Sequence, residues 1–416
     1  MEYNWVLFAI AAIGGFFMAF SNGANDVANA FASAVGSKAL SVRQALMIAS
    51  TLTLVGAVLL GSKVVSTLVG GVIQPDIFSS ADHYILGMLS CLLAAGFFVL
   101  VSTLTGLPVS STHAIVGAMT GVGISLGGFS TVNWPLLTGI AISWVASPFI
   151  AAFIAFWSIK LIYLFIYRPG KKTIIDRFVR FAPGFLAFAC AIIAFSLIHK
   201  SSLKAYLLIS AWEIPILFLA LYFAFYLTAR YFIGFWTLRA ENSEKGTERL
   251  FRKLQIGTSS FVAFAHGSND VANSISPVLA IFAVMKMGVI PANFDNITIP
   301  LWILCLGGIG MATGTAALGY KVIATLGEKI TLITNSKGFC VDFSTAITVV
   351  FASILGIPIS TTHAATGSII GVGFFQGKKG LNFSLLAKIL IAWVFTVPLA
   401  ALVTVLCYWI LKSILL

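Results

Sequence analysis

The residues best suited to chemistry in this chain lie in a short polar motif that occurs twice within apolar sequence. GANDVAN at residues 23–29 returns as GSNDVAN at residues 267–273, with six of seven positions identical. Each copy carries one aspartate, Asp26 or Asp270, and an ionised carboxylate at the centre of a bilayer costs about 2.5–3.5 kcal/mol. So costly a residue, repeated in matching surroundings, indicates a binding site. The structural alternative is that these polar residues only cap and hydrogen-bond broken helices.

The ligand atoms that these motifs offer are oxygens. Carboxylate and amide oxygens come from the aspartates and asparagines, and the glycine that opens each motif lets backbone carbonyls approach closely. Hard cations prefer all-oxygen sites, and no Cys or His cluster accompanies the motifs to favour a soft metal. The motifs therefore predict Na⁺ sites, with protonation of the aspartate as the alternative. The predicted Na⁺ ligands are Gly23, Asn25, Asp26, Ser111, Asn269, Asp270 and Thr361.

A second repeated motif combines a proline with a run of hydroxyl groups. LPVSSTHAIVGAMTGVG at residues 107–123 returns as IPISTTHAATGSIIGVG at residues 357–373, with nine of seventeen positions identical. The proline interrupts any preceding helix, and the hydroxyls then occupy the N-cap and first turn of a new one. Helix N-termini bind anions, although ordinary capping is the simpler alternative. The anion ligands that this motif predicts are Ser110, Ser111, Thr112, Ser360, Thr361 and Thr362, whereas His113 and His363 are expected to orient or pack.

The two motifs complement one another in charge. The hydroxyl-bearing helix starts suit an anion, the Asp/Asn pockets suit cations, and neither motif contains Lys or Arg. A bound anion would be neutralised largely by cations bound with it, so neither ligand binds well without the other. An inside-negative potential opposes entry of a dianion by about 4.6 kcal/mol per 100 mV, and two co-transported monovalent cations remove that opposition.

The composition places these motifs in a membrane. The chain has 416 residues, of which 59% are hydrophobic and 9% charged, against about 25% charged in soluble domains. Residues 84–107 and 134–159 contain no charge, which is typical of transmembrane helices. The start, MEYNWVLF, has no basic region, so no cleaved signal peptide is expected. The five cysteines are scattered packing residues, and the net charge of +12 is concentrated in loops, which argues against nucleic acid.

The repeats and linkers predict an all-α architecture with about twelve transmembrane helices. Residues 1–167 form a first repeat, 168–253 a central helical hairpin between basic linkers, and 254–416 a second repeat. The Lys/Arg excess of the linkers makes their side cytoplasmic. Five crossings in each repeat would invert the second relative to the first and leave the N-terminus extracytoplasmic. This count assumes that the GANDVAN segment interrupts its helix without adding a crossing. Inverted repeats with interrupted or re-entrant helices are typical of secondary transporters.

The motifs closely resemble those of the inorganic phosphate transporter family, the sodium–phosphate symporters and their proton- or metal-linked relatives. GANDVANAF, GSNDVANS, PVSSTH and PISTTH carry the resemblance, together with residues 324–363. The resemblance implies phosphate as substrate, twelve crossings and a homodimer. It also implies that Asp26, Asp270 and their asparagines serve the sodium and phosphate sites, with Asn29 and Asn273 as phosphate ligands, while the hydroxyl runs at 110–112 and 360–362 hold phosphate.

The resulting hypothesis is a symporter of the cell membrane that imports inorganic phosphate with Na⁺. At neutral pH phosphate keeps a P–OH group, which can donate a hydrogen bond to a carboxylate, whereas sulfate has no such group. A site with Asp26 or Asp270 near the hydroxyls is therefore expected to prefer phosphate to sulfate. The alternatives are an H⁺-coupled permease of the same fold for phosphate, metal–phosphate or sulfate, and, from another class, an anion channel or a phosphate-sensing receptor. An enzyme is not expected, because no nucleophile–base pair occurs beyond the Ser/Thr–His neighbours, and no cofactor is expected apart from the transported cation.

Overall fold

The computed structural model describes residues 5–74, 78, 80–200, 212–291, 294, 297–323, 333–377 and 381–415. Within this part the chain is helical, and its only β interaction is an isolated bridge between Ile73 and Val132. The predicted all-α membrane fold is confirmed.

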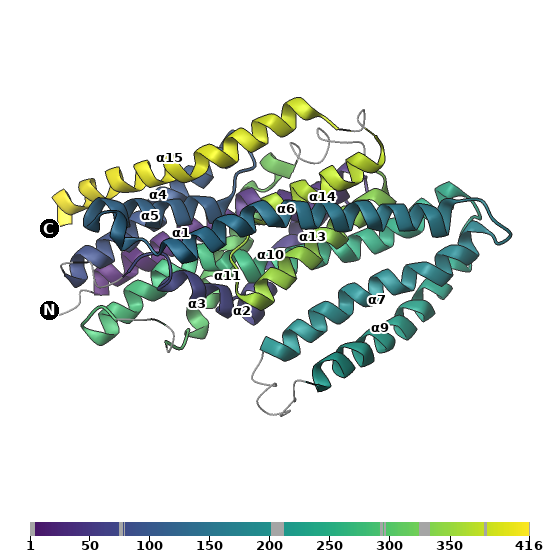
Figure 1. The fold of residues 1–416 in the computed structure, drawn as a ribbon, viewed down its shortest axis with the longest axis horizontal. Helices are drawn as coiled ribbons and strands as arrows, with labels where there is room; N and C mark the ends of the chain where they lie inside the picture. The colour runs from purple at the N-terminus through teal and green to yellow at the C-terminus, as the bar shows by residue number, and fades with distance from the viewer. Residues whose placement is uncertain are drawn as a thin grey trace.

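The helices of the two repeats follow one another in matching order (Figure 1). The first repeat contains α1 (Trp5–Gly36), α2 (Val42–Leu60), α3 (Ser62–Val69), α4 (Ala81–Leu104), α5 (Ser111–Gly127) and α6 (Trp134–Ile162), with the short turns η2 (Phe129–Thr131) and η3 (Tyr163–Tyr167). The second contains α10 (Glu244–Met287), α11 (Leu301–Leu318), α13 (Asn335–Leu355), α14 (Thr361–Phe375) and α15 (Phe383–Leu415).

Ten helices in the described part are long and apolar enough to cross a membrane. The remaining two of the twelve predicted segments are α5 and α14, which have 17 and 15 residues, and a transmembrane helix needs about 20. Each folds back on the helix before it. Gly87 in α4 packs against Val122 in α5, and Ser344 in α13 donates a hydrogen bond to Ser368 in α14. Both pairs are therefore re-entrant hairpins.

The two hairpins point toward each other from opposite ends of the molecule. Figure 1 shows α4 and α5 left of centre and α13 and α14 right of centre. Their tips meet, because Thr112 Oγ1 donates to the Ile359 carbonyl and Thr362 Oγ1 donates to the Val109 carbonyl, both at 3.1 Å. This opposed arrangement is the inverted symmetry that the repeats predict.

The helices that carry the GANDVAN and GSNDVAN motifs are continuous, so the predicted interruption at these motifs is wrong. α1 runs for 32 residues and α10 for 44, straight through their motifs. At 1.5 Å per residue α1 is about 48 Å long, which is one crossing with turns to spare. The amides find partners on other segments, as Asn22 Nδ2 does on the Asp270 carbonyl at 2.9 Å. They therefore need not compete with the backbone hydrogen bonds of their own helix.

Each repeat packs its motif helix against the other repeat. α1 lies on α11 and α10 lies on α2. These crossings are close: a Cβ on Gly23 would lie 2.0 Å from the Met311 carbonyl oxygen, and one on Gly267 would lie 2.0 Å from that of Thr53. Such approaches admit only glycine. The glycines that open the motifs therefore serve helix packing.

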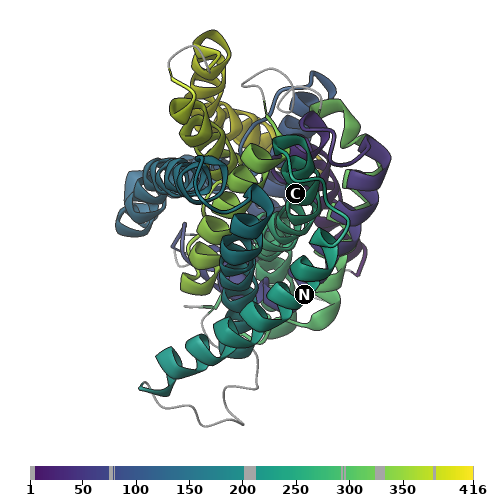
Figure 2. The same ribbon diagram turned by 90° about the vertical axis from the view of Figure 1, so that its right-hand side faces the viewer.

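The central pair α7 (Ile174–Lys200) and α9 (Glu213–Thr237) stands at the margin of the bundle in both views (Figures 1 and 2). Residues 201–211 of the predicted hairpin lie outside the described residues. The described helix runs on to Thr237. The predicted boundary after residue 253 falls inside α10, which starts at Glu244.

We predict that Gly267→Ala destabilises the fold, whereas Gly257→Ala in the same helix does not. The first places a methyl group against the Thr53 carbonyl, and such overpacking costs about 1–3 kcal/mol. The second meets no atom within 4 Å and gains up to about 1 kcal/mol of helix propensity. Thermal unfolding of the two purified variants in detergent makes the comparison. Equal midpoints would contradict the packing role of Gly267.

Candidate functional site

The starts of α5 and α14 form the first part of the site. The helices break at the prolines as predicted, and Ser110 and Ser360 are the N-caps, each accepting a hydrogen bond from the backbone N–H of a histidine, His113 or His363, at 3.2 Å. The first backbone N–H groups of a helix have no carbonyl four residues earlier to bind. Because the hairpin tips meet, two such helix starts face one region.

The two aspartates lie directly against these starts. Asp26 accepts hydrogen bonds from Ser111 Oγ at 2.6 Å, Asn29 Nδ2 at 3.2 Å and Thr362 Oγ1 at 3.3 Å. Asp270 accepts one from Thr361 Oγ1 at 2.7 Å. Both carboxylates are fully buried. The residues predicted from two separate motifs are thus brought together at one place.

The second asparagine of each motif connects the repeats. Asn29 Nδ2 donates to Thr361 Oγ1 at 3.2 Å and to Thr362 Oγ1 at 3.0 Å, although these residues lie more than 330 positions away. Asn273 Nδ2 donates to Ser111 Oγ and Thr112 Oγ1, both at 3.2 Å. The site is therefore a single two-fold arrangement built from both halves of the chain.

The first asparagine of each motif holds its own hairpin. Asn25 Oδ1 accepts the Val109 N–H, and Asn25 Nδ2 donates to Thr103 Oγ1 and the Leu107 carbonyl, all at 3.1 Å. Asn269 Nδ2 donates to Ser353 Oγ at 3.1 Å and the Ile357 carbonyl at 3.3 Å. The Gly23 carbonyl accepts Thr315 Oγ1 at 2.9 Å. Three of the seven predicted Na⁺ ligands thus shape the walls of the site.

The histidines after the hydroxyls tie each hairpin to a helix of the opposite repeat. His113 Nδ1 lies 3.2 Å from the Trp393 carbonyl on α15, and His363 Nδ1 lies 2.9 Å from the Trp144 carbonyl on α6. The rings also stack, with centroids 3.8 Å apart for His113–Trp144 and 3.6 Å for His363–Trp393. This geometry matches the orienting role expected from the sequence.

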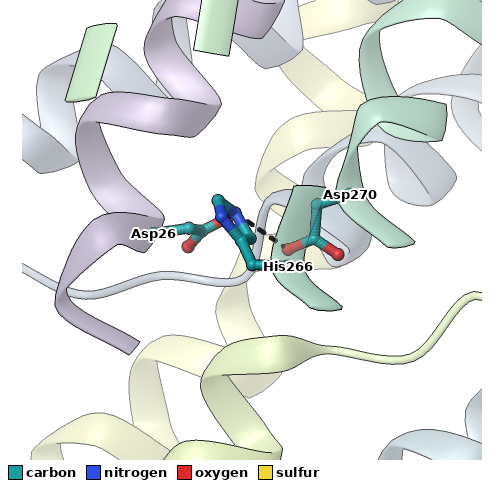
Figure 3. A group of neighbouring side chains, drawn as sticks. All are labelled: Asp26, His266 and Asp270. Atoms are coloured by element: carbon teal, nitrogen blue, oxygen red, sulfur yellow. Dashed lines mark ion pairs between the residues drawn. The ribbon is translucent and has the colours of Figure 1, made fainter. Parts of the chain in front are cut away.

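Sequence reasoning missed one residue of the site, His266. Its Nε2 lies 3.3 Å from Asp270 Oδ2 and 4.0 Å from Asp26 Oδ2, and its side chain is 1% exposed (Figure 3). The signal was present, because His266 directly precedes the GSNDVAN motif, where the first copy has Asn22. It breaks the symmetry of the two copies and was overlooked for that reason.

The ionisable side chains of the site are two carboxyl groups and one imidazole. Throughout the described residues, the two aspartates have ion-pair contacts only with His266, and no Lys or Arg belongs to the buried set. A third buried carboxylate, Asp342, accepts hydrogen bonds from the hydroxyls of Ser33 and Ser259. Buried charges need partners. An anion could enter this region only with cations beside it.

Opposed re-entrant hairpins whose tips enclose a buried polar site define a membrane transporter. The chain matches the model of the phosphate transporter family over residues 22–404, and it belongs to that family. The expected resemblance is confirmed.

Relatives agree along the whole length. A solved structure titled "The sodium-dependent phosphate transporter" is 41% identical, superposes with a TM-score of 0.91, and is matched over 99% of this chain and 100% of its own. A Thermococcus kodakarensis protein named as a candidate phosphate permease is 40% identical over 98% of both chains. The chloroplastic inorganic phosphate transporter 2-1 of Arabidopsis thaliana is 36% identical over 96% of this chain and 71% of its own.

We predict that Asn25→Ala destabilises the protein even without ions or phosphate. The substitution leaves the Val109 N–H and the Leu107 carbonyl without their partner, and each buried unsatisfied group costs about 1–3 kcal/mol. Asn25→Asp keeps the acceptor for Val109, but it turns an oxygen toward the Leu107 carbonyl and buries another carboxylate, so it should not restore the lost stability. Unfolding of the two variants without phosphate or added metal ions makes the comparison. If Asn25→Ala is as stable as the wild type without ions or phosphate, Asn25 does not hold the hairpin, and its role would be to bind Na⁺.

Proposed function

We propose that this protein imports inorganic phosphate by symport with Na⁺ across the cell membrane, with its N-terminus outside. The observation that carries the proposal is the pairing of each buried aspartate with a hydroxyl at the start of a re-entrant helix, Asp26 with Ser111 and Asp270 with Thr361. The phosphate transporter family supplies the substrate, and the solved relative is sodium-dependent by its title.

The pairing suggests how the two ligands are coupled. In the ligand-free arrangement the hydroxyl hydrogens of Ser111 and Thr361 point at the carboxylates. A Na⁺ ion on the carboxylate oxygens would replace those hydrogens and could share the hydroxyl oxygen, since Na⁺ is a hard cation that prefers oxygen ligands. The freed O–H groups would then donate to phosphate. Cation binding thereby creates the anion site, which is the coupling that linkage requires.

Phosphate would lie between the two helix starts. Free N–H groups at each N-terminus and the positive ends of both helix dipoles favour an anion there. Thr112 and Thr362 add hydroxyls that now bind the opposite hairpin tip. A carboxylate beside the anion could accept the P–OH hydrogen of phosphate, which sulfate cannot offer.

Alternating access follows from the opposed hairpins. Each hairpin fills the path from the site to one end of the molecule, so withdrawing one tip opens the site to one side only. Such a step would change the hydrogen bonds between a hairpin tip and the opposite repeat. For the tip of α14 these include the bonds of Thr361 and Thr362 with Asn29 and of Thr362 with the Val109 carbonyl. For the tip of α5 they include the bonds of Ser111 and Thr112 with Asn273 and of Thr112 with the Ile359 carbonyl. We also expect a homodimer, which crosslinking in native membranes would test.

We predict that purified protein in liposomes accumulates labelled phosphate when an inward Na⁺ gradient is imposed, and that an H⁺ gradient alone does not drive uptake. Accumulation against a phosphate gradient separates a symporter from a channel or receptor. Uptake driven by H⁺ and indifferent to Na⁺ would establish the H⁺-coupled alternative. Competition by sulfate at comparable concentration would contradict the choice of phosphate.

We predict that Asp26→Asn abolishes Na⁺-dependent uptake. The amide keeps the size of the side chain, but its single oxygen is neutral, so the Coulomb attraction for the cation is lost. Asp82→Asn, in the first turn of α4 and outside the site, is the matched control and should transport normally. Retained Na⁺ dependence in Asp26→Asn would remove this carboxylate from the cation site.

We predict that Ser111→Ala raises the phosphate KM about tenfold, because one donor hydrogen bond contributes about 1–2 kcal/mol. Ser90→Ala is the control. Ser90 is also buried, lies in the same hairpin, and donates to the Leu86 carbonyl of its own helix rather than to an aspartate of the site. An equal effect of the two substitutions would show that buried serines matter for packing alone.

A further inference from the structure

We propose that Asp26, His266 and Asp270 form a binding site for a first-row divalent transition metal such as Zn²⁺, and that this metal blocks transport by joining α1 to α10. The binding part of the proposal stands on the geometry of the cluster. The blocking part rests on the proposed symport, because it supposes that the same carboxylates bind Na⁺ during transport.

The three side chains already have the separations of metal ligands. One ligand atom of each residue lies within 4.8 Å of the other two. His266 Nε2 is 3.3 Å from Asp270 Oδ2 and 4.0 Å from Asp26 Oδ2. In a tetrahedral zinc site with bonds of about 2.1 Å, neighbouring ligand atoms are about 3.4 Å apart. The His266–Asp270 separation already fits this value, whereas Asp26 would have to move closer by about 0.6 Å or more. Figure 3 shows the imidazole between the two carboxylates.

Two unsatisfied atoms point to a ligand here. His266 Nε2 and Asp270 Oδ1 are buried and make no hydrogen bond in the structure. Both side chains are at most 1% exposed. Buried polar atoms are nearly always satisfied, so each exception calls for a partner. A metal ion bound by the imidazole satisfies His266 Nε2, and it satisfies Asp270 Oδ1 as well if Asp270 binds through both carboxylate oxygens.

The ligand atoms of the cluster favour a transition metal over Na⁺, Mg²⁺ and Ca²⁺. Imidazole nitrogen suits Zn²⁺ and the neighbouring transition metals, whereas Na⁺, Mg²⁺ and Ca²⁺ prefer oxygen alone. His266 and Asp270 are four residues apart on α10 and therefore share one helix face, and Asp26 comes from α1. The equivalent of His266 in the first repeat is Asn22, which uses its amide on the Asp270 carbonyl. The second repeat alone therefore supplies the nitrogen ligand.

A metal at this position would hold the protein in one state. Its bonds would join the motif helices of the two repeats beside both hairpin tips. Transporters of this kind move one repeat-built unit against the rest, so a metal that joins the two repeats would prevent that movement. The metal would also occupy two carboxylates that Na⁺ needs. Zn²⁺ should therefore inhibit uptake, and raised Na⁺ should relieve the inhibition.

The test begins with metal binding to the full-length protein in detergent. Isothermal titration with Zn²⁺, and the visible absorption of Co²⁺ as a spectroscopic probe, should show one site per chain. His266→Asn copies the residue of the first repeat and should weaken binding at least tenfold. His83→Asn removes a histidine that contacts Ser80 outside the site, and it should bind Zn²⁺ as the wild type does. Equal affinity in the wild type and His266→Asn would overturn the proposal.

Transport supplies the second readout. Zn²⁺ should reduce Na⁺-driven phosphate uptake by the wild type in liposomes. Each variant is compared with its own metal-free rate, and His266→Asn should be at least tenfold less sensitive. If His266→Asn does not fold, His266→Gln and competition of Na⁺ with Zn²⁺ for binding to the wild type replace it. Zn²⁺ that binds without slowing uptake, or that enters with phosphate, would overturn the block. Failure of Na⁺ to drive any uptake would instead refute the proposed symport and leave the binding result intact.

Discussion

The structure depends on two carboxyl groups that are buried in the membrane-spanning part of the protein, where an ionised carboxylate is most costly. Asp26 and Asp270 are fully buried, and each accepts a hydrogen bond from a hydroxyl at the start of a short helix. The hydroxyl can reach the carboxylate only if the preceding helix stops midway and the chain turns back. The re-entrant hairpins are therefore a consequence of where the carboxylates lie. A straight crossing in place of α4 and α5 would carry Ser111 away from Asp26.

The second asparagine of each motif explains why the site needs both repeats. One repeat alone has a polar helix and a hairpin, but its asparagine at the end of the motif finds no hydroxyl of its own to bind. Asn29 and Asn273 each bind the hydroxyls of the other repeat. The helix crossings follow the same exchange, since α1 packs on α11 and α10 on α2. The site and the fold thus share one two-fold arrangement, and neither half can form the site alone.

The two repeats differ at two buried positions that bear ionisable side chains in the second repeat only. His266 replaces Asn22, and Asp342 has a leucine, Leu92, as its counterpart. The first difference places an imidazole between the two aspartates, and the second buries a carboxylate against Ser33 and Ser259 in the second repeat alone. The two orientations of such a transporter need not be equivalent in energy or in ion affinity. A single unequal residue near the centre is sufficient to make them differ.

The sequence by itself determined the membrane class, the duplication, the two motifs and the chemical character of the ligands. These follow from composition, periodicity and residue type, which are local properties of the chain. It also located the two helix breaks near Pro108 and Pro358, because proline followed by a run of hydroxyl residues is typical of a helix start. It could not show that α1 and α10 remain continuous, since that depends on partners for Asn22 and Asn25 that lie far along the chain. The place of His266 between two carboxylates depended likewise on how α1 crosses α10. Only the tertiary structure decided these points, because a buried polar side chain is defined by what surrounds it, and here most of those neighbours come from the other half of the sequence.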